Sequence, residues 1–357
     1  MPKVSVLMPV YDATAFLADA IESILSQTMA DFELLIVCEY GADDQVLRIA
    51  REYAGMDSRV VFVHNERHLG LSASLNVGIR AARGEYIARM DADDLCLPHR
   101  FKIQADFLDV HPGIGLCGCE VEFIDRRGGT ICNRDSFSTQ PAQIKSDLLF
   151  YCCLRHPSVM FRKSLFLEHD LLYDEGYTAT EDFELWNRAC HTTDFVNVPE
   201  VLLRYRWYKG NATHRNNRQG ISNYLQVMDR SFRRLGLLFS DENLLLLCPI
   251  TCRVDPKNHR RILTAAAVFE RSILEANAEK GIYDDAALRH TLDRRFYWKH
   301  HPIRLYMACL LRGLADSLCR GNPDAKLYSV TNYLEENGFR QTVLRIAAET
   351  AAMLLHR

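Results

Sequence analysis

Short apolar runs alternate with helical patterns over residues 1–94, and this alternation restricts the fold more than any other feature. Nearly all-apolar runs, of the kind buried on both faces of a parallel sheet, predict strands at residues 3–9, 32–38 and 60–64. Apolar residues at helical spacing follow each run and predict helices at residues 16–27, 43–54 and 71–83. We expect Asp12 or Thr14 to cap the first helix and Gly84 to end the third. The alternation indicates right-handed βαβ crossovers and a parallel sheet.

A fourth predicted strand begins at Glu85 and stops at an acidic cluster, which consists of Asp91, Asp93 and Asp94. In an extended chain Asp91 and Asp93 project to the same face. The carboxyl ends of parallel strands are also where open α/β sheets bind ligands. Close carboxylates repel one another unless a cation lies between them, and their hard oxygens suit Mg²⁺ or Mn²⁺. The alternative is an acidic turn that caps the next helix, because Asp is a favoured turn and N-cap residue.

The predicted elements are less regular beyond the acidic cluster. Helices are expected at residues 98–110 and 181–190, and strands at residues 115–124, 156–161 and 198–208. Polar residues without a pattern predict loops at residues 132–143 and 209–219. From about residue 220 onward only helical periods remain, including one through residues 307–318, so we expect a helical extension or small second domain there.

The composition describes an ordinary globular protein. With 357 residues, 25% charged residues and a formal net charge of −3, the chain shows no global bias toward nucleic acid. The 12 cysteines include no CxxC pair, which favours buried thiols in a reducing compartment over a disulfide framework or a zinc site. Neither a secretion signal nor an apolar run of about 18 residues is recognisable. We therefore expect a cytoplasmic protein, either free or peripheral at the inner face of the cell membrane.

Five blocks of sequence occur in the order typical of one enzyme family. They read PKVSVLMPVYDATAFLADAIESILSQT, FELLIVCEYGADD, HLGLSASLNVGIRAARGEYIARMDADDLCLPHRF, RHPSVMFRKS and ATEDFELWNRA. From residue 3 to about residue 210, the chain resembles bacterial family 2 inverting glycosyltransferases with the GT-A fold. The resemblance implies an α/β nucleotide-diphospho-sugar transferase domain with a Rossmann-like, mostly parallel sheet over residues 1–219. Its donor-binding half would end at about residue 94, its acceptor half would span residues 95–219, and residues 220–357 would form the helical extension.

The function implied by this resemblance is transfer of a sugar from a nucleotide-diphosphate sugar, with UDP-sugars favoured, to a hydroxyl group. The acceptor would be a glycan or a lipid-linked glycan in cell-surface polysaccharide synthesis. A non-catalytic protein that binds nucleotide sugars or glycans is the first alternative, because the segment CEYG departs from the family pattern. A sugar nucleotidyltransferase is the second, although its glycine- and arginine-rich phosphate loop is missing after the first strand. Neither a dinucleotide GxGxxG motif nor a P-loop is present.

The resemblance also implies roles for the acidic residues. In similar enzymes the first Asp of DAD lies near the ribose and the last binds a divalent metal ion, which carries over to Asp91 and Asp93. Asp94 is expected to cap the following helix. Asp182 matches the Asp of the family's ED motif, which is the base that takes the proton of the acceptor hydroxyl. The other interpretation of Glu181 and Asp182 is structural, because acidic residues stabilise the N-terminus of a helix.

The nucleotide end of the expected site is formed by the tips of the first two strands. The family folds the loop after the first strand around the base and ribose, which here concerns Pro9, Tyr11 and Asp12. The second strand normally ends in two Asp residues, the latter contacting uracil. This chain has Cys38 and Glu39 there, so we expect Glu39 to bind the nucleotide with a longer side chain.

Several residues on the acceptor or diphosphate side carry two interpretations each, one functional and one structural; they are His156, Glu181, Trp186, Arg206, Lys209 and His214. Trp186 is either a core residue or a wall of the acceptor site. Arg206, Lys209 and His214 are expected on a segment that closes over the diphosphate, or else on a solvated loop. Further on, the basic and aromatic residues 289–314 either contact an anionic membrane surface or form an amphipathic packing helix.

Overall fold

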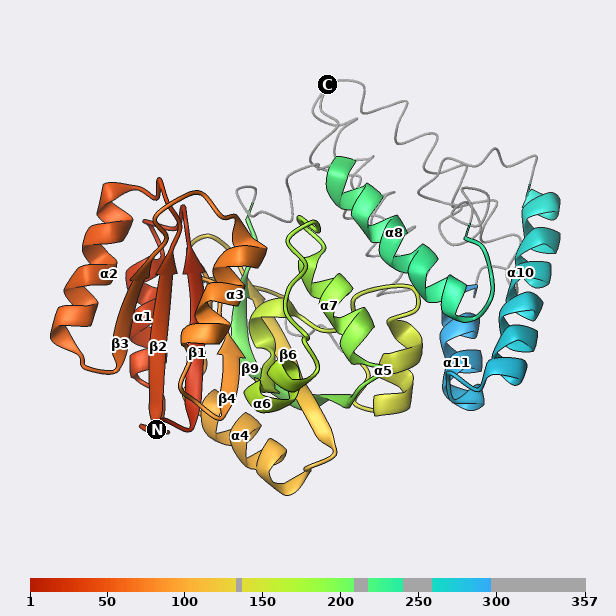
Figure 1. Cartoon of the computed structure of the whole chain (residues 1–357), viewed down its shortest axis with the longest axis horizontal. Helices are drawn as coiled ribbons and strands as arrows, with labels where there is room; N and C mark the ends of the chain where they lie inside the picture. Colours follow the sequence, from red (N-terminus) through yellow and green to blue (C-terminus); the bar gives the residue numbers. More distant parts are fainter. Residues whose placement is uncertain (133–136, 209–217, 240–258, 297–357) are drawn as a thin grey trace, which may run out of the picture. The chain divides into compact units, whose positions relative to one another are not determined.

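The computed structural model describes residues 1–132, 137–208, 218–239 and 259–296 (Figure 1). The chain divides into two compact units, Met1–Phe232 and Arg233–Arg357. Most of helix α8 (Arg218–Arg234) belongs to the first unit. Within the described ranges, no helix combines the length and the apolar character that crossing a lipid bilayer requires.

The first unit begins with four parallel strands in the order β3-β2-β1-β4. They are β1 (Val4–Val10), β2 (Phe32–Cys38), β3 (Val60–His64) and β4 (Tyr86–Arg89). The register pairs Val4 with Phe32 on one side and with Tyr86 on the other. From β1 to β2 and from β2 to β3 the chain crosses over to the adjacent strand, as the alternating pattern predicts, and from β3 it returns past β2 and β1 to place β4 on the other side of β1. All four strands therefore end at the same edge of the sheet.

Helices cover both faces of these strands, which explains why the strands are apolar at most positions. Alternate residues of β1, such as Val6 and Met8, join a core that includes residues of α1 (Leu17–Leu25), α2 (Asp44–Met56) and α4 (Arg100–Val110). Leu7 points the other way, toward α3 (Leu71–Ala81). A Cβ added at Gly78 of α3 would lie 2.0 Å from Leu7 Cδ1, so the glycine allows this close helix packing.

The sheet continues beyond β4 with strands of mixed direction. The order is β4-β8-β6-β9-β5, and β7 pairs with β6 outside this path. Both β4 and β6 (Ile114–Ile124) run antiparallel to β8 (Met160–Arg162), whereas β6 and β9 (Asp194–Arg206) are parallel. The short strands β5 (Leu95–Cys96) and β7 (Thr130–Cys132) were not predicted from the sequence. The helices on this side of the unit are α5 (Pro141–Asp147), α6 (Lys163–Glu168) and α7 (Glu181–Ala189).

Three local predictions were wrong. The strand expected at residues 156–161 is a 3₁₀ turn, His156–Ser158, followed by β8, because Pro157 lacks the N–H that a central strand requires. Helix α1 begins after Phe16 and has no side-chain cap, so neither Asp12 nor Thr14 caps it. Gly84 does not adopt the left-handed conformation of a helix C-cap. It instead allows a close approach of the backbones, since an added Cβ would lie 2.5 Å from Ser5 N.

In the second unit the structure describes α10 (His259–Lys280) and α11 (Asp285–Arg295). The Asp284 side chain caps α11 by accepting a hydrogen bond from Ala287 N at 2.9 Å. The Asn277 side chain donates from Nδ2 to the carbonyl oxygen of Tyr283 and accepts at Oδ1 from Tyr283 N. These two hydrogen bonds fix the turn between the helices. The helical period predicted at residues 307–318 and most of the basic segment at residues 289–314 lie outside the described residues.

Candidate active site

The acidic cluster lies where β4 ends, at the same edge as the tips of β1 and β2. A turn brings Asp91, Asp93 and Asp94 together, so that one carboxylate oxygen of each lies within 4.8 Å of the others. Asp91 and Asp93 are half-buried, whereas Asp94 is fully buried. The structure thus confirms that the three carboxylates converge, although through a turn instead of an extended strand.

Asp94 has a different role from the expected helix cap. Helix α4 begins only at Arg100 and receives no side-chain cap. Asp94 Oδ1 accepts a hydrogen bond from Arg206 N at 2.8 Å, whereas the buried Oδ2 has no hydrogen-bond partner. Burial, followed by repulsion from Asp91 and Asp93, raises the pKa of Asp94 well above its usual value. One oxygen of this carboxyl therefore anchors β9, and the other is buried without a hydrogen bond.

The cluster fits a divalent cation on the evidence of its own electrostatics. Burial and the neighbouring charge of Asp91 raise the pKa of Asp93 to about 6. A hydrogen bond from Tyr208 Oη, at 3.3 Å, is the side-chain contact of Asp93 Oδ2. Two carboxyls with raised pKa values and one unbonded buried oxygen form a set of hard donors that a bound cation would stabilise. These residues therefore suit Mg²⁺ or Mn²⁺.

Arg89, the last residue of β4, is a buried cation that the sequence interpretation missed. Its guanidinium forms an ion pair with Asp91. Despite the effect of burial, the negative charge of Asp91 raises the pKa of Arg89. The sequence contained a signal for this role, because Arg89 lies in a predicted strand that ends directly before the acidic cluster. Since a buried arginine stays charged, Arg89 holds the Asp91 side chain in place through this ion pair.

Arg206 was expected on a mobile basic segment, and the structure corrects this. It ends β9, is only 3% exposed, and donates from Nε to the carbonyl oxygen of Asp93 at 2.7 Å. Its Nη1 donates to the carbonyl oxygens of Asp125 and Arg126, and the guanidinium covers the ring of Phe16. Arg206 therefore holds the backbone of the acidic cluster in place. Lys209 and His214 lie outside the described residues.

The tip of β1 is open at this edge. Pro9 is half-buried within the strand, while Tyr11 and Asp12 are exposed in the loop that follows. The Tyr11 ring lies edge-on to His68 with 6.4 Å between ring centroids. An exposed tyrosine and an exposed carboxylate beside the acidic cluster are suitable groups for a base and a ribose.

Glu39, at the tip of β2, has both carboxylate oxygens hydrogen-bonded to other groups of the protein. Oε1 accepts hydrogen bonds from the backbone N–H groups of Tyr40 at 2.8 Å and Leu69 at 3.0 Å. Oε2 accepts from Gly70 N at 2.7 Å and Ser74 Oγ at 2.9 Å. Burial acts to raise the pKa of Glu39, but these hydrogen bonds outweigh it and the pKa is lowered. Glu39 is therefore an ionised residue that holds the start of α3.

A second acidic pair, Glu181 and Asp182, forms the first turn of α7 as predicted. Asp182 is half-buried; Oδ1 accepts from Phe183 N at 2.7 Å and Oδ2 accepts from Cys152 Sγ at 3.7 Å. Burial raises the pKa of Asp182. Burial and the adjacent charge of Asp182 raise the pKa of Glu181 to about 7. A half-buried carboxylate whose pKa is raised in this way has the properties of a general base.

Trp186 and His156 lie behind this pair. Trp186 is fully buried and packs against aromatic core residues, so it is not an acceptor wall; its neighbours include Phe161, Phe166 and Phe195. His156 Nε2 lies 2.7 Å from Tyr173 Oη, and Nδ1 lies 3.7 Å from Glu181 Oε1. Burial, and then the charge of Arg89, lower the pKa of His156 well below its usual value. A neutral His156 therefore supports the site from inside the protein.

The two acidic groups lie within electrostatic range of each other. The charge of Arg89 partly offsets the rise that burial causes in the pKa of Asp93, and it does the same for Asp182. The negative charge of Asp91 in turn raises the pKa of Glu181. Residues at the end of β4 and at the start of α7, far apart in sequence, thus lie within range of each other's charges.

Comparison with known proteins agrees with this architecture. A family model described as "Glycosyl transferase family 2" matches residues 5–168. An uncharacterized glycosyltransferase of Methanocaldococcus jannaschii is 35% identical over 208 residues, which cover 57% of this chain and 71% of that protein. The putative glycosyltransferase EpsE of Bacillus subtilis is 34% identical over 251 residues, covering 67% and 85% of the two chains. The O-antigen biosynthesis glycosyltransferase WbnJ of Escherichia coli is 31% identical over 210 residues, covering 57% and 79%.

Solved structures show the same fold. The crystal structure of Staphylococcus aureus TarS residues 1–349 in complex with UDP-GlcNAc has a TM-score of 0.53 at 15% identity, and its complex with UDP has a TM-score of 0.51 at 16% identity. Each likeness covers 90% of this chain and 93% of TarS residues 1–349. The chain belongs to glycosyltransferase family 2, and its first unit has the GT-A fold, followed by C-terminal helices.

Proposed function

We propose that this protein is an inverting glycosyltransferase that moves a sugar from a nucleotide-diphosphate sugar to a hydroxyl of a glycan or lipid-linked glycan. The observation that carries the proposal is the pair of acidic groups in one electrostatic field, the cluster at Asp91 and Asp93 and the half-buried Asp182. Relatives named for O-antigen and amylovoran biosynthesis favour a role in cell-surface polysaccharide synthesis. The complex of TarS with UDP-GlcNAc makes a UDP-sugar the first donor to test.

The acidic cluster would hold the donor. Asp93, with Asp94 beside it, would bind Mn²⁺ or Mg²⁺, and Asp91, fixed by Arg89, would contact the ribose. The bound ion would neutralise the negative charge that gathers on the departing diphosphate. Tyr11 and Asp12 would lie along the base and ribose.

Asp182 would act on the acceptor. Its carboxylate removes the proton of the attacking hydroxyl, on the face of the sugar opposite to the leaving diphosphate. The raised pKa makes Asp182 a stronger base than an exposed aspartate. Such a base contributes roughly 10² to 10⁴-fold to the rate.

The remaining parts of the proposal concern location and domain roles. Residues 1–94 would bind the donor and residues 95–219 the acceptor, in a cytoplasmic protein. Contact with the inner face of the membrane through residues 289–314 stays a prediction, and the structure describes only residues 289–296 of that segment.

The proposal is tested with the purified full chain and a panel of UDP-, dTDP- and GDP-sugars in the presence of Mn²⁺. Asp93→Asn, or EDTA, should abolish the thermal stabilisation by the donor, because the diphosphate loses its cation. Asp182→Asn should keep this stabilisation and reduce transfer by at least ~10²-fold. Asp106→Asn, an exposed carboxylate paired with Lys102, is the matched control and should change neither measurement.

Two results would overturn the proposed roles. Turnover that persists in EDTA or in Asp93→Asn would show that the reaction does not require the metal ion. Normal transfer by Asp182→Asn would show that Asp182 is not the base. Donor binding without turnover, for every donor and acceptor tried, would favour the non-catalytic alternative.

A further inference from the structure

We propose that Arg230 of helix α8 is a positioning residue for the base, because it fixes the first turns of α7 and the loop that leads into them. The inference rests on the proposed function in one respect, the role of Asp182 as base. Helix α8 follows the segment that the family model matches, residues 5–168. The sequence predicts that its residues from Gly220 onward belong to the helical extension.

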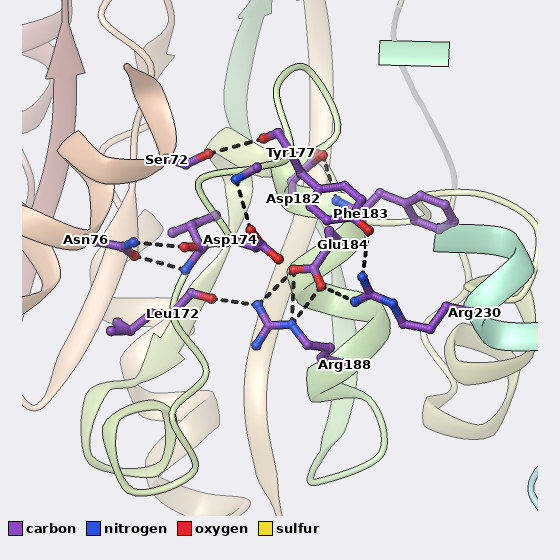
Figure 2. Close-up of polar contacts among 12 residues, drawn as sticks. Ser72, Asn76, Leu172, Asp174, Tyr177, Asp182, Phe183, Glu184, Arg188 and Arg230 are labelled. Carbon is purple, nitrogen blue, oxygen red and sulfur yellow. Dashed lines mark hydrogen bonds and ion pairs between the residues drawn. The ribbon is translucent and has the colours of Figure 1, made fainter. Parts of the chain in front are cut away.

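Arg230 reaches α7 and the preceding loop with its two terminal nitrogens (Figure 2). Nη1 donates to Glu184 Oε1 at 2.6 Å, and Nη2 donates to Tyr177 Oη at 2.6 Å. Glu184 lies only two residues after Asp182 and is 1% exposed. Its carboxylate also accepts from Arg188 at 2.8 Å. Charge-assisted hydrogen bonds at a buried carboxylate are among the stronger ones in proteins, so this contact fixes the turn that carries the base.

The loop before α7 is held from two sides. On one side Ser72 Oγ of α3 donates to the carbonyl oxygen of Tyr177 at 3.3 Å, and the Asn76 side chain bonds the backbone of Tyr173 (Figure 2). On the other side Asn223 Nδ2 of α8 donates to the carbonyl oxygen of Thr178 at 3.2 Å. The loop therefore connects a helix of the donor half to α8, and it ends at the base.

The backbone at Ala179 supports this interpretation. Ala179 has a φ of 61°, a left-handed conformation that L-residues other than Asn and Asp rarely adopt. Such a residue persists where its surroundings fix it, and here the contacts at Tyr177 and Thr178 come directly before it. Ala179 lies three residues before Asp182. If these contacts were lost, a return of Ala179 to an ordinary conformation would redirect the start of α7.

Helix α8 has other contacts that would keep it docked without Arg230. The Tyr224 ring stacks on Phe183 with 4.5 Å between centroids, and Tyr224 Oη donates to the carbonyl oxygen of Phe150 at 2.8 Å. Phe232 is fully buried and lies edge-on to Phe150. A substitution at Arg230 therefore tests one contact and not the whole helix.

The test compares Arg230→Gln and Arg230→Lys with wild type in the full chain. Hydrogen exchange of the peptides that cover residues 174–184 should be faster in Arg230→Gln, because the loop loses the hydrogen bond at Tyr177 Oη and α7 loses the one at Glu184. The kcat of transfer should fall by about tenfold or more, as expected for a misplaced base, while the dissociation constant of the donor with Mn²⁺ stays unchanged. Arg230→Lys, which keeps the charge and can bond Glu184, should recover part of kcat.

Arg48→Gln is the matched control, since Arg48 is 66% exposed on α2 and pairs only loosely with Glu52 at 4.0 Å. It should alter neither exchange nor kcat. Unchanged exchange and unchanged kcat in Arg230→Gln would overturn the inference. A loss of donor affinity as large as the loss of kcat would also overturn it, because the substitution would then act on the donor site and not only on the base. A wild-type chain without transfer activity would instead refute the proposed function, and the exchange rates would still decide whether Arg230 fixes the loop.

Discussion

Glu39 shows how hydrogen bonds within the protein can saturate one carboxylate. A carboxylate offers about four acceptor positions, and four donors of Tyr40, Leu69, Gly70 and Ser74 fill those of Glu39. Its extra methylene, relative to the Asp expected there, lets it reach the loop before α3. We therefore expect the nucleobase to be recognised by other groups at this edge, such as the exposed Tyr40, which directly follows Glu39, and the exposed Tyr11, which directly follows β1.

Glu181 and Asp182 titrate as a pair because they are adjacent and poorly hydrated. Burial and the charge of Asp182 raise the pKa of Glu181 to about 7, and burial raises that of Asp182. When both groups are protonated, no base is present. As the pH rises, the pair first loses one proton and then, near pH 7, the second. The second step leaves two negative charges side by side and so produces the stronger base.

Glu181→Gln should reduce this titration to a single step. In wild type we expect kcat/KM to rise with pH in two steps, the upper one near pH 7. In Glu181→Gln the upper step should vanish and the lower one remain, because glutamine is neutral at every pH. Initial rates of transfer across the range provide the measurement. Glu175→Gln, an exposed glutamate of the same loop, should keep both steps. An upper step that survives in Glu181→Gln would assign it to another group.

Among the elements, those with strong patterns of their own were predicted well. The strands β2 and β3 have the predicted limits, because each is a mostly apolar run with a pattern of its own. The strands β5 and β7 are two and three residues long, and only their partners β9 and β6 define them. A pattern within one segment carries no information about such a strand.

In the site, too, features formed by residues close in sequence could be predicted, whereas contacts between distant residues could not. The convergence of Asp91, Asp93 and Asp94 could be predicted because they are close in sequence. The hydrogen bond from Arg206 to Asp93 joins residues 113 positions apart, and that from Arg230 to Glu184 joins residues 46 apart. No spacing rule identifies such partners, and for Arg206 the local composition suggested a different role.

Gly84 tests the contact between β1 and β4, on which the position of the acidic cluster depends. In Gly84→Ala the new Cβ would lie 2.5 Å from Ser5 N and 2.8 Å from Ser5 Oγ. Because one of these atoms is backbone, the start of β4 must move, and we expect a loss of about 1–3 kcal/mol in the free energy of unfolding. Urea unfolding measures it. Gly113→Ala is the control, since nothing lies within 4 Å of its added Cβ. Equal stability of the two variants would contradict the close approach.

At the scale of the whole molecule, the first compact unit extends to Phe232 and so includes most of α8. The family pattern ends near residue 210, and the sequence-based boundary at residue 219 lies inside this helix. The hydrogen bonds of Asn223 and Tyr224 to Thr178 and Phe150 show that α8 packs against the first unit close to Asp182. We propose on these grounds that α8 belongs to the catalytic domain.

Two truncations should therefore behave differently. A chain of residues 1–236 should unfold cooperatively and bind donor with Mn²⁺, because it retains all of α8. A chain of residues 1–217 exposes the surface of Phe150 and Phe183 that Phe232 and Tyr224 cover. Loss of such large aromatic contacts costs about 3–5 kcal/mol, so the shorter chain should unfold at much lower urea concentration. If both chains were equally stable, α8 would be an independent extension, and Arg230 would have no basis for positioning Asp182.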